Sequence, residues 1–96
     1  MLLEEIRAKR EDIRTLGERY GARHIRVFGS VARGEDRADS DVDFLVEFPR
    51  GYDLIRQRLA LLASLEQLLN RPVEVIPEHE LDPHLRDAVL REAVEL

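Results

Sequence analysis

The sequence predicts an α/β (α+β) domain in which helices cover a small mixed β-sheet, with the element order αββαβα. Three segments place apolar residues at helical spacing, and three shorter segments are rich in β-branched and aromatic residues. A helix of about seventeen residues is expected between the second and third strands, which favours a crossover and a parallel strand pair. We expect residues 1–96 to form one domain, because so short a chain builds a single core.

Residues 2–20 are predicted to form the first helix, because apolar side chains recur near one face and Gly21 can end the helix in a left-handed conformation. The members of this face are Leu3, Ile6, Ile13, Leu16 and Tyr20. Residues 25–28 are predicted to form the first strand, which runs into a tight turn at Gly29 and Ser30.

A helical turn over residues 31–33 and a polar loop lead to the second strand, residues 42–48, in which apolar and polar side chains alternate. One face of this strand carries Val42, Phe44, Val46 and Phe48, and the other carries Asp41, Asp43, Leu45 and Glu47. The strand is therefore expected to have one apolar face and one largely acidic face.

Asp53 is predicted to cap the longest apolar helix, which should end near Asn70. Its stripe comprises Leu54, Ile55, Leu59, Leu62, Leu65, Leu68 and Leu69. Residues 73–76 are predicted to form the third strand, and Asp82 and Pro83 to begin the last helix. Three residues of that helix are expected to point inward: Leu85, Val89 and Ala93.

The composition argues against several classes of protein. No apolar run approaches the roughly 20 residues that span a bilayer, and the acidic first residues do not resemble a secretory signal, so we expect a cytoplasmic protein. Because the chain has no cysteine, any metal must be held by oxygen or histidine ligands. The net charge is −5 without a basic stripe, so direct binding of nucleic acid is not expected.

Two short motifs carry the chemistry. A strand that enters Gly29-Ser30 leaves backbone N–H groups unpaired at the turn, where glycine lets a phosphate approach and the serine hydroxyl can donate to it. Asp41 and Asp43 stand two apart on a strand, so their Cα atoms are about 6.6 Å apart and their carboxylates can share one or two hard cations. An Asp-x-Asp pair arises by chance about 0.65 times in so acidic a chain, so only the combination is informative.

The combined motif reads Gly29-Ser30-x-x-Arg33-Gly34, then Ser40-Asp41-x-Asp43. It resembles the signature of the DNA polymerase β-like nucleotidyltransferase superfamily. The short length and the C-terminal sequence from residue 73 resemble the minimal nucleotidyltransferase (MNT) branch of that superfamily. The resemblance covers about residues 20–96 and implies the polymerase β-like nucleotidyltransferase fold.

The resemblance also implies roles for individual residues. Gly29 and Ser30 would hold the triphosphate of ATP, and Asp41 and Asp43 would bind two Mg²⁺ ions. The family's third acidic residue, most often Asp, binds the second metal and helps to deprotonate the attacking hydroxyl. Here Glu74 stands at the matching position, with the neighbouring valines expected on the core face.

Arg33 has two roles open to it. Its guanidinium could contact the phosphates of the nucleotide, or it could anchor the acidic loop by pairing with a carboxylate. The candidate carboxylates are Asp36, Asp39 and Asp41.

The activity implied by the resemblance is transfer of AMP from ATP to a hydroxyl group. The implied partner is a HEPN-domain toxin with a tyrosine as the acceptor, so that the chain acts as an antitoxin. Glu74 in place of Asp keeps an alternative open, in which a non-catalytic antitoxin or nucleotide-sensing module neutralises its partner by binding alone. Homo-oligomers and hetero-oligomers both remain open, and transfer to a small molecule or an RNA end is disfavoured by the lack of a second domain.

Overall fold

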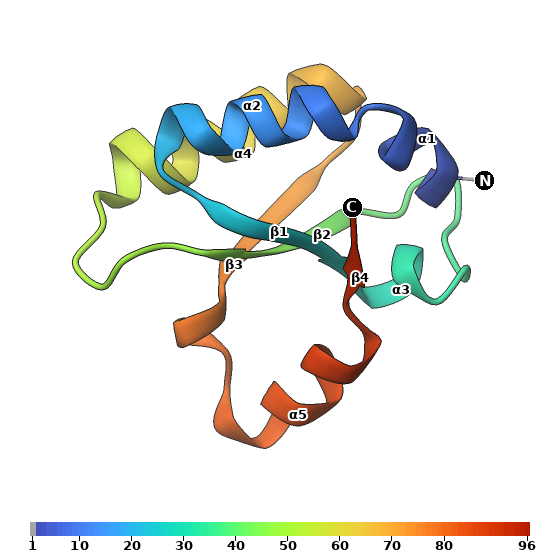
Figure 1. Cartoon of the computed structure of the whole chain (residues 1–96). Coiled ribbons are helices and arrows are strands. Elements are labelled where there is room, and N and C mark those ends of the chain that lie inside the picture. The colour runs from blue at the N-terminus through green and yellow to red at the C-terminus, as the bar shows by residue number, and fades with distance from the viewer. Residues whose placement is uncertain (1) are drawn as a thin grey trace.

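The computed structural model describes residues 2–96 and shows a four-stranded mixed sheet with helices on both faces (Figure 1). The strand order is β3-β2-β1-β4. The strands are β1 (Arg23–Phe28), β2 (Val42–Glu47), β3 (Val73–Pro77) and β4 (Val94–Glu95). Strand β2 pairs antiparallel with β1 and parallel with β3, and β4 pairs antiparallel with β1. The predicted fold class and the parallel crossover are confirmed.

The helices form unequal layers on the two faces of the sheet. Helices α2 and α4 lie side by side on one face, and α5 lies on the other (Figure 1). The helices are α1 (Leu2–Ala8), α2 (Arg10–Tyr20), α3 (Gly29–Ala32), α4 (Ala60–Leu69) and α5 (Pro83–Glu92), with a short 3₁₀ helix, η2 (Glu78–Glu80). None of the helices within residues 2–96 is both long and apolar enough to cross a membrane.

The hydrophobic core lies between the sheet and the layer of α2 and α4. Its fully buried members include Ile6, Ile13, Val27, Val42, Phe44, Val46, Leu61, Leu65 and Val75. The side chains of β2 alternate about the sheet, so that burying Val42, Phe44 and Val46 turns Asp43 and Glu47 to the face that α5 only partly covers. The core thus fixes which face of the sheet is acidic.

Helix ends follow their local sequence, as predicted. The Asp53 carboxylate accepts a hydrogen bond from the Arg56 amide at 2.8 Å, and the Asp82 carboxylate accepts one from the His84 amide at 2.8 Å. Asn70 ends α4 in the left-handed conformation, with φ of 54°.

The first helix is not continuous over residues 2–20, as the sequence had predicted, but is broken at Lys9. The break turns α1 toward α3, while α2 packs on α4 and β1. Ile6 and Ile13 are both buried as a result, in separate parts of the core. The ammonium of Lys9 donates to the carbonyl of Leu68 at 3.2 Å, which ties the break to the end of α4.

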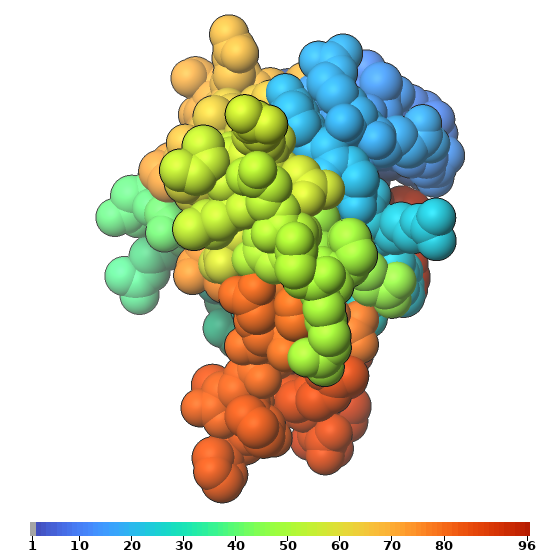
Figure 2. All heavy atoms as spheres, turned by 90° about the vertical axis from the view of Figure 1, so that its left-hand side faces the viewer, coloured from blue at the N-terminus to red at the C-terminus, as the bar shows by residue number. Residues whose placement is uncertain are grey.

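The helix after Asp53 begins with a π-helical segment, η1 (Leu54–Leu59), which the sequence pattern did not predict. Because its hydrogen bonds join residues five apart, Leu54 and Leu59 share a face, and both are exposed, with Ile55 exposed by 69%. Leu61, which lies outside the predicted stripe, is fully buried. The start of the predicted stripe is therefore exposed, whereas Leu62, Leu65, Leu68 and Leu69 lie in or against the core as predicted. Figure 2 shows this segment (yellow-green) on the surface above α5.

The C-terminal region also differs from its prediction. Leu85, expected to point inward, is 58% exposed, whereas Val89 and Ala93 are partly buried. α5 buries none of its residues fully and is held mainly by polar contacts of its arginine and glutamate side chains. The residues after it form β4, which no sequence signal indicated, and Val94 pairs with Val27 of β1.

The exposed start of the helix after Asp53 and the burial of Leu61 can be tested with two matched truncations. Leu61→Ala should lower the free energy of unfolding by about 3 kcal/mol, because it leaves a cavity in a packed core. Leu54→Ala removes the same atoms from an exposed position and should cost below about 1 kcal/mol. Urea unfolding followed by circular dichroism measures both, and equal costs would contradict the exposure of Leu54 and the burial of Leu61.

Candidate active site

Asp43 lies at the centre of the candidate active site, on β2 between two neighbouring strands. Its Cα is paired with Phe28 of β1 on one side and with Glu74 of β3 on the other. Phe28 is the last residue of β1, and Gly29 and Ser30 follow it as the first residues of α3. The register therefore brings the Gly29-Ser30 turn and two of the predicted acids to one end of the sheet.

The Asp43 carboxylate lies directly against the backbone of Gly29. Gly29 has φ of 76°, in the left-handed region that favours glycine. A Cβ built on Gly29 would overlap Oδ2 of Asp43 and lie 3.2 Å from its Cγ. Any other residue at this position would therefore displace the carboxylate.

The other two predicted acids flank Asp43. Asp41 is exposed and immediately precedes β2, so its predicted place within the strand is wrong by one residue. Glu74 is exposed on β3, while Val73 and Val75 are buried on the core face, as the alternation predicts. Asp43 and Glu74 thus come from adjacent parallel strands, and Asp41 comes from the residue before β2.

The electrostatics of this cluster favour a cation. The pKa of Asp43 is raised to about 6, first by burial and then, in decreasing order, by the charge of Glu74, a hydrogen bond with Glu74 and the charges of Asp41 and Glu92. Within residues 2–96, none of Asp41, Asp43 and Glu74 forms an ion pair with a basic side chain. Oxygen ligands without a cationic partner suit a hard divalent ion such as Mg²⁺, which would offset their repulsion.

Ser30 and Arg33 lie on the other side of the turn. The hydroxyl of Ser30 has no hydrogen-bond partner within the described part of the chain, so it is free to donate to an anion. The guanidinium of Arg33 pairs with Glu35 at 2.8 Å and with Glu92 at 2.9 Å. The carboxylate partners that the sequence suggested for Arg33, namely Asp36, Asp39 and Asp41, are therefore wrong.

Sequence reasoning missed Glu92, the last residue of α5. Its Oε1 accepts a hydrogen bond from the Gly29 amide at 2.9 Å. This amide, expected to be unpaired at the turn, is thus already paired. Glu92 belongs to the C-terminal segment that carried the family resemblance, but it stands 63 residues from Gly29, and no spacing rule connects the two.

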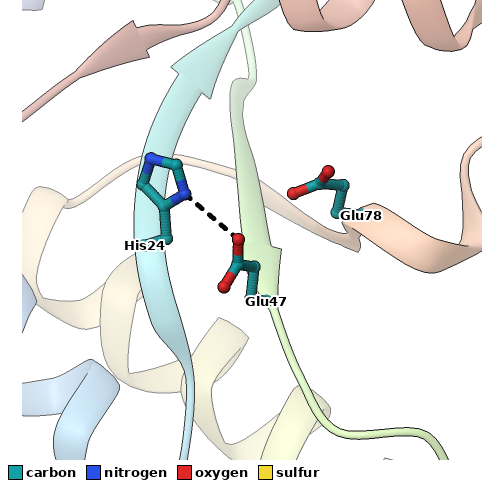
Figure 3. A group of neighbouring side chains, drawn as sticks. All are labelled: His24, Glu47 and Glu78. Atoms are coloured by element: carbon teal, nitrogen blue, oxygen red, sulfur yellow. Dashed lines mark hydrogen bonds and ion pairs between the residues drawn. The ribbon is translucent and has the colours of Figure 1, made fainter.

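A second group of potential metal ligands, His24, Glu47 and Glu78, lies at the other end of the sheet (Figure 3). His24 donates from Nδ1 to Glu47 at 3.1 Å and from Nε2 to Glu95, and these two bonds raise the pKa of His24, the bond to Glu95 more strongly. Glu78 pairs with two arginines, at 2.6 Å and 3.1 Å. Because both ring nitrogens of His24 already face carboxylates and Glu78 is held by two arginines, these side chains form a network of hydrogen bonds and ion pairs.

Comparisons with known proteins agree over almost the whole chain. A model of the nucleotidyltransferase domain family matches residues 5–96. The protein adenylyltransferase MntA of Thermococcus cleftensis is 40% identical over 98 residues, which cover 98% of this chain and 95% of that protein. A candidate protein adenylyltransferase of Methanocaldococcus jannaschii is 37% identical over 78 residues, which cover 81% of this chain and 83% of that protein.

Two solved structures share the fold. One, described as a candidate minimal nucleotidyltransferase, is 50% identical with a TM-score of 0.87 and covers 100% of this chain and 97% of that one. The other, described as a toxin-antitoxin crystal structure with AMP-PNP, is 23% identical with a TM-score of 0.75 and covers 88% of this chain and 69% of that one. At that identity the second likeness shows the fold alone.

The raised pKa of Asp43 generates a prediction about stability. Because the folded chain holds this proton more tightly than the unfolded chain, the wild type should lose stability as the pH rises from about 4 to about 6. Asp43→Asn removes the charge and should be more stable than the wild type by about 1–2 kcal/mol at pH 7.5, a value reduced for the partial exposure of the side chain. The difference should shrink toward zero at pH 4.

Urea unfolding of both proteins without divalent ions measures this difference across the pH range. Asp36→Asn, in the polar loop before β2, is the matched control and should change stability little at any pH. A destabilised Asp43→Asn at pH 7.5 would contradict the electrostatic account.

Proposed function

The chain belongs to the nucleotidyltransferase domain family, and on that basis we propose that it transfers AMP from ATP to a hydroxyl group of a partner protein. The partner that we propose is a HEPN-domain toxin with a tyrosine as the acceptor, so that the chain acts as an antitoxin. The names of its relatives as protein adenylyltransferases support the reaction, and the resemblance to the minimal nucleotidyltransferase branch suggests the kind of partner. The observation that carries the proposal is the juxtaposition of Gly29, Asp43 and Glu74.

In this proposal the two sides of the turn bind different parts of the substrate. Asp41, Asp43 and Glu74 hold Mg²⁺ ions, and these ions, when bound, neutralise phosphate charge and lower the pKa of the attacking hydroxyl. The Ser30 hydroxyl donates to the triphosphate, and glycine at position 29 lets the phosphates approach the backbone. Arg33 is placed to contribute a further donor, although two carboxylates already share it.

The transfer step needs little covalent participation by the protein. The acceptor oxygen attacks the α-phosphorus of ATP, a new P–O bond forms, and the bond to the bridging oxygen of pyrophosphate breaks. Pyrophosphate leaves with the electron pair of that bond, and the hydroxyl proton passes to Glu74 and from there to solvent. Positioning of the two reactants and stabilisation of the phosphate charge therefore supply most of the rate enhancement.

A partner protein would complete this site. Cavities of about 410 Å³ and 430 Å³ lie elsewhere on the chain, and Asp41, Asp43 and Glu74 line neither of them. Asp41 and Glu74 are exposed and Asp43 is partly exposed, so an acceptor side chain from a second protein can reach them. The proposal accordingly favours a hetero-oligomer in which the toxin supplies the acceptor.

The transfer can be tested by incubating the chain, ATP and Mg²⁺ with a purified HEPN-domain protein, and measuring the intact masses of both proteins. The wild type should add one or more AMP groups to that protein. Asp41→Asn/Asp43→Asn should slow the addition by about 100-fold or more, because it removes ligands for ions that stabilise the transition state by several kcal/mol. Asp36→Asn/Asp39→Asn removes the same charge from the adjacent loop and should leave the rate within about twofold.

Three results would count against parts of the proposal. An unmodified partner under every condition argues against transfer. Full activity of Asp41→Asn/Asp43→Asn argues against the assigned ligands. A double variant that no longer transfers AMP but still neutralises the toxin in cells identifies an antitoxin that acts by binding alone.

A further inference from the structure

One carboxylate joins both ends of the short helix that follows β1. Glu92 accepts the Gly29 amide on Oε1 at 2.9 Å and the Arg33 guanidinium on Oε2 at 2.9 Å. Gly29 begins α3, and Arg33 caps its other end. The Glu92 side chain is 26% exposed and comes from the last turn of α5, so the contact also fastens α5 to the rest of the fold.

A four-residue helix cannot hold its own position, because isolated helices this short are unstable. The position of α3 must therefore come from contacts with other elements. Val31 supplies one such contact by its complete burial, and Glu92 supplies the other at the end that faces Asp43. Since the Gly29 backbone touches the Asp43 carboxylate, a shift of the turn would move the proposed phosphate site relative to the proposed metal ligands.

A bound phosphate could displace the Glu92 carboxylate from the Gly29 amide, but the hydrogen bonds of Glu92 argue against this. Each of its oxygens makes a separate hydrogen bond, one with the Gly29 amide and one, charge-assisted, with the Arg33 guanidinium. Displacement would break both bonds and leave the carboxylate beside other acids. The Ser30 hydroxyl and the amides beyond Gly29 remain available to a phosphate while Glu92 stays in place.

We propose that Glu92 is a positioning residue for nucleotide binding, which fixes the Gly29-Ser30 turn against Asp43 by accepting the Gly29 amide. This inference rests on the proposed function, since it concerns the same site. Glu92 itself touches neither the reacting phosphate nor the acceptor in this scheme.

The test compares Glu92→Ala with Glu92→Gln, using isothermal titration with ATP and Mg²⁺ on the full chain. Glu92→Ala should weaken binding about tenfold, the loss expected for one hydrogen bond of moderate strength. Glu92→Gln retains an oxygen that can accept the Gly29 amide and should bind within about threefold of the wild type. The matched control is Glu35→Ala, which removes the other carboxylate of Arg33 but leaves the Gly29 bond, and it should bind within about twofold.

A second readout is independent of nucleotide. In ¹H–¹⁵N spectra of the chain alone, the Gly29 amide signal should move upfield in Glu92→Ala and stay near its wild-type position in Glu35→Ala. If Glu92→Ala does not fold, Glu92→Asp replaces it; this variant keeps the charge but is one methylene too short to span both partners, so it should also bind more weakly.

The outcomes separate this inference from the proposed function. Unchanged binding by Glu92→Ala, tighter binding by both Glu92 variants, or equal losses in Glu92→Ala and Glu35→Ala would each overturn the positioning role. A wild type that binds ATP and Mg²⁺ but modifies no partner contradicts the proposed transfer and leaves the positioning role standing. A wild type that binds no nucleotide overturns both.

Discussion

The close approach of the Asp43 carboxylate to the Gly29 backbone is the contact on which the site depends. It requires a left-handed backbone and no side chain at position 29, and glycine meets both conditions at least cost. It also requires the register that pairs Asp43 with Phe28, because a shift of one residue would turn Asp43 into the core. Burial of Val42 and Phe44 on the opposite face enforces that register.

The site concentrates negative charge that the fold alone does not compensate. The charges of Glu74, Asp41 and Glu92 all raise the pKa of Asp43, although Glu92 also pairs with Arg33, which it shares with Glu35. Such clusters destabilise a folded chain, and they are typical of positions that bind a cation or transfer a proton. The apolar layer formed by α2, α4 and the core face of the sheet supplies the stability that offsets this cost.

Local sequence was enough to predict the helix ends at Asp53, Asn70 and Asp82, because each end depends on one residue and its neighbouring amides. The π-helical start of the helix after Asp53 could not be predicted, because the apolar pattern does not distinguish a π-helical turn from an α-helical one, and a tertiary contact is also made there. There the Arg58 side chain donates to the carbonyl of Val75 at 2.8 Å.

In the candidate site, too, local sequence patterns predicted some features and contacts between distant residues could not be predicted. The positions of the Gly29 turn, Asp43 and Glu74 follow from strand periodicity and a parallel crossover, which the sequence contains. The contact from Glu92 to Gly29 arises only when α5 returns across the sheet. Strand β4 was missed for a related reason, since only two of its residues pair, and they do so with a strand distant in sequence.

The most direct measurement is a crystal structure of the chain soaked with Mn²⁺ and a non-hydrolysable ATP analogue, with anomalous scattering used to locate the metal. The account expects a manganese peak coordinated by oxygens of Asp41 and Asp43, on the side of Glu74, with phosphate oxygens completing the shell beside Ser30. Bound nucleotide with manganese at any other carboxylates, such as Glu47 and Glu78, would contradict it.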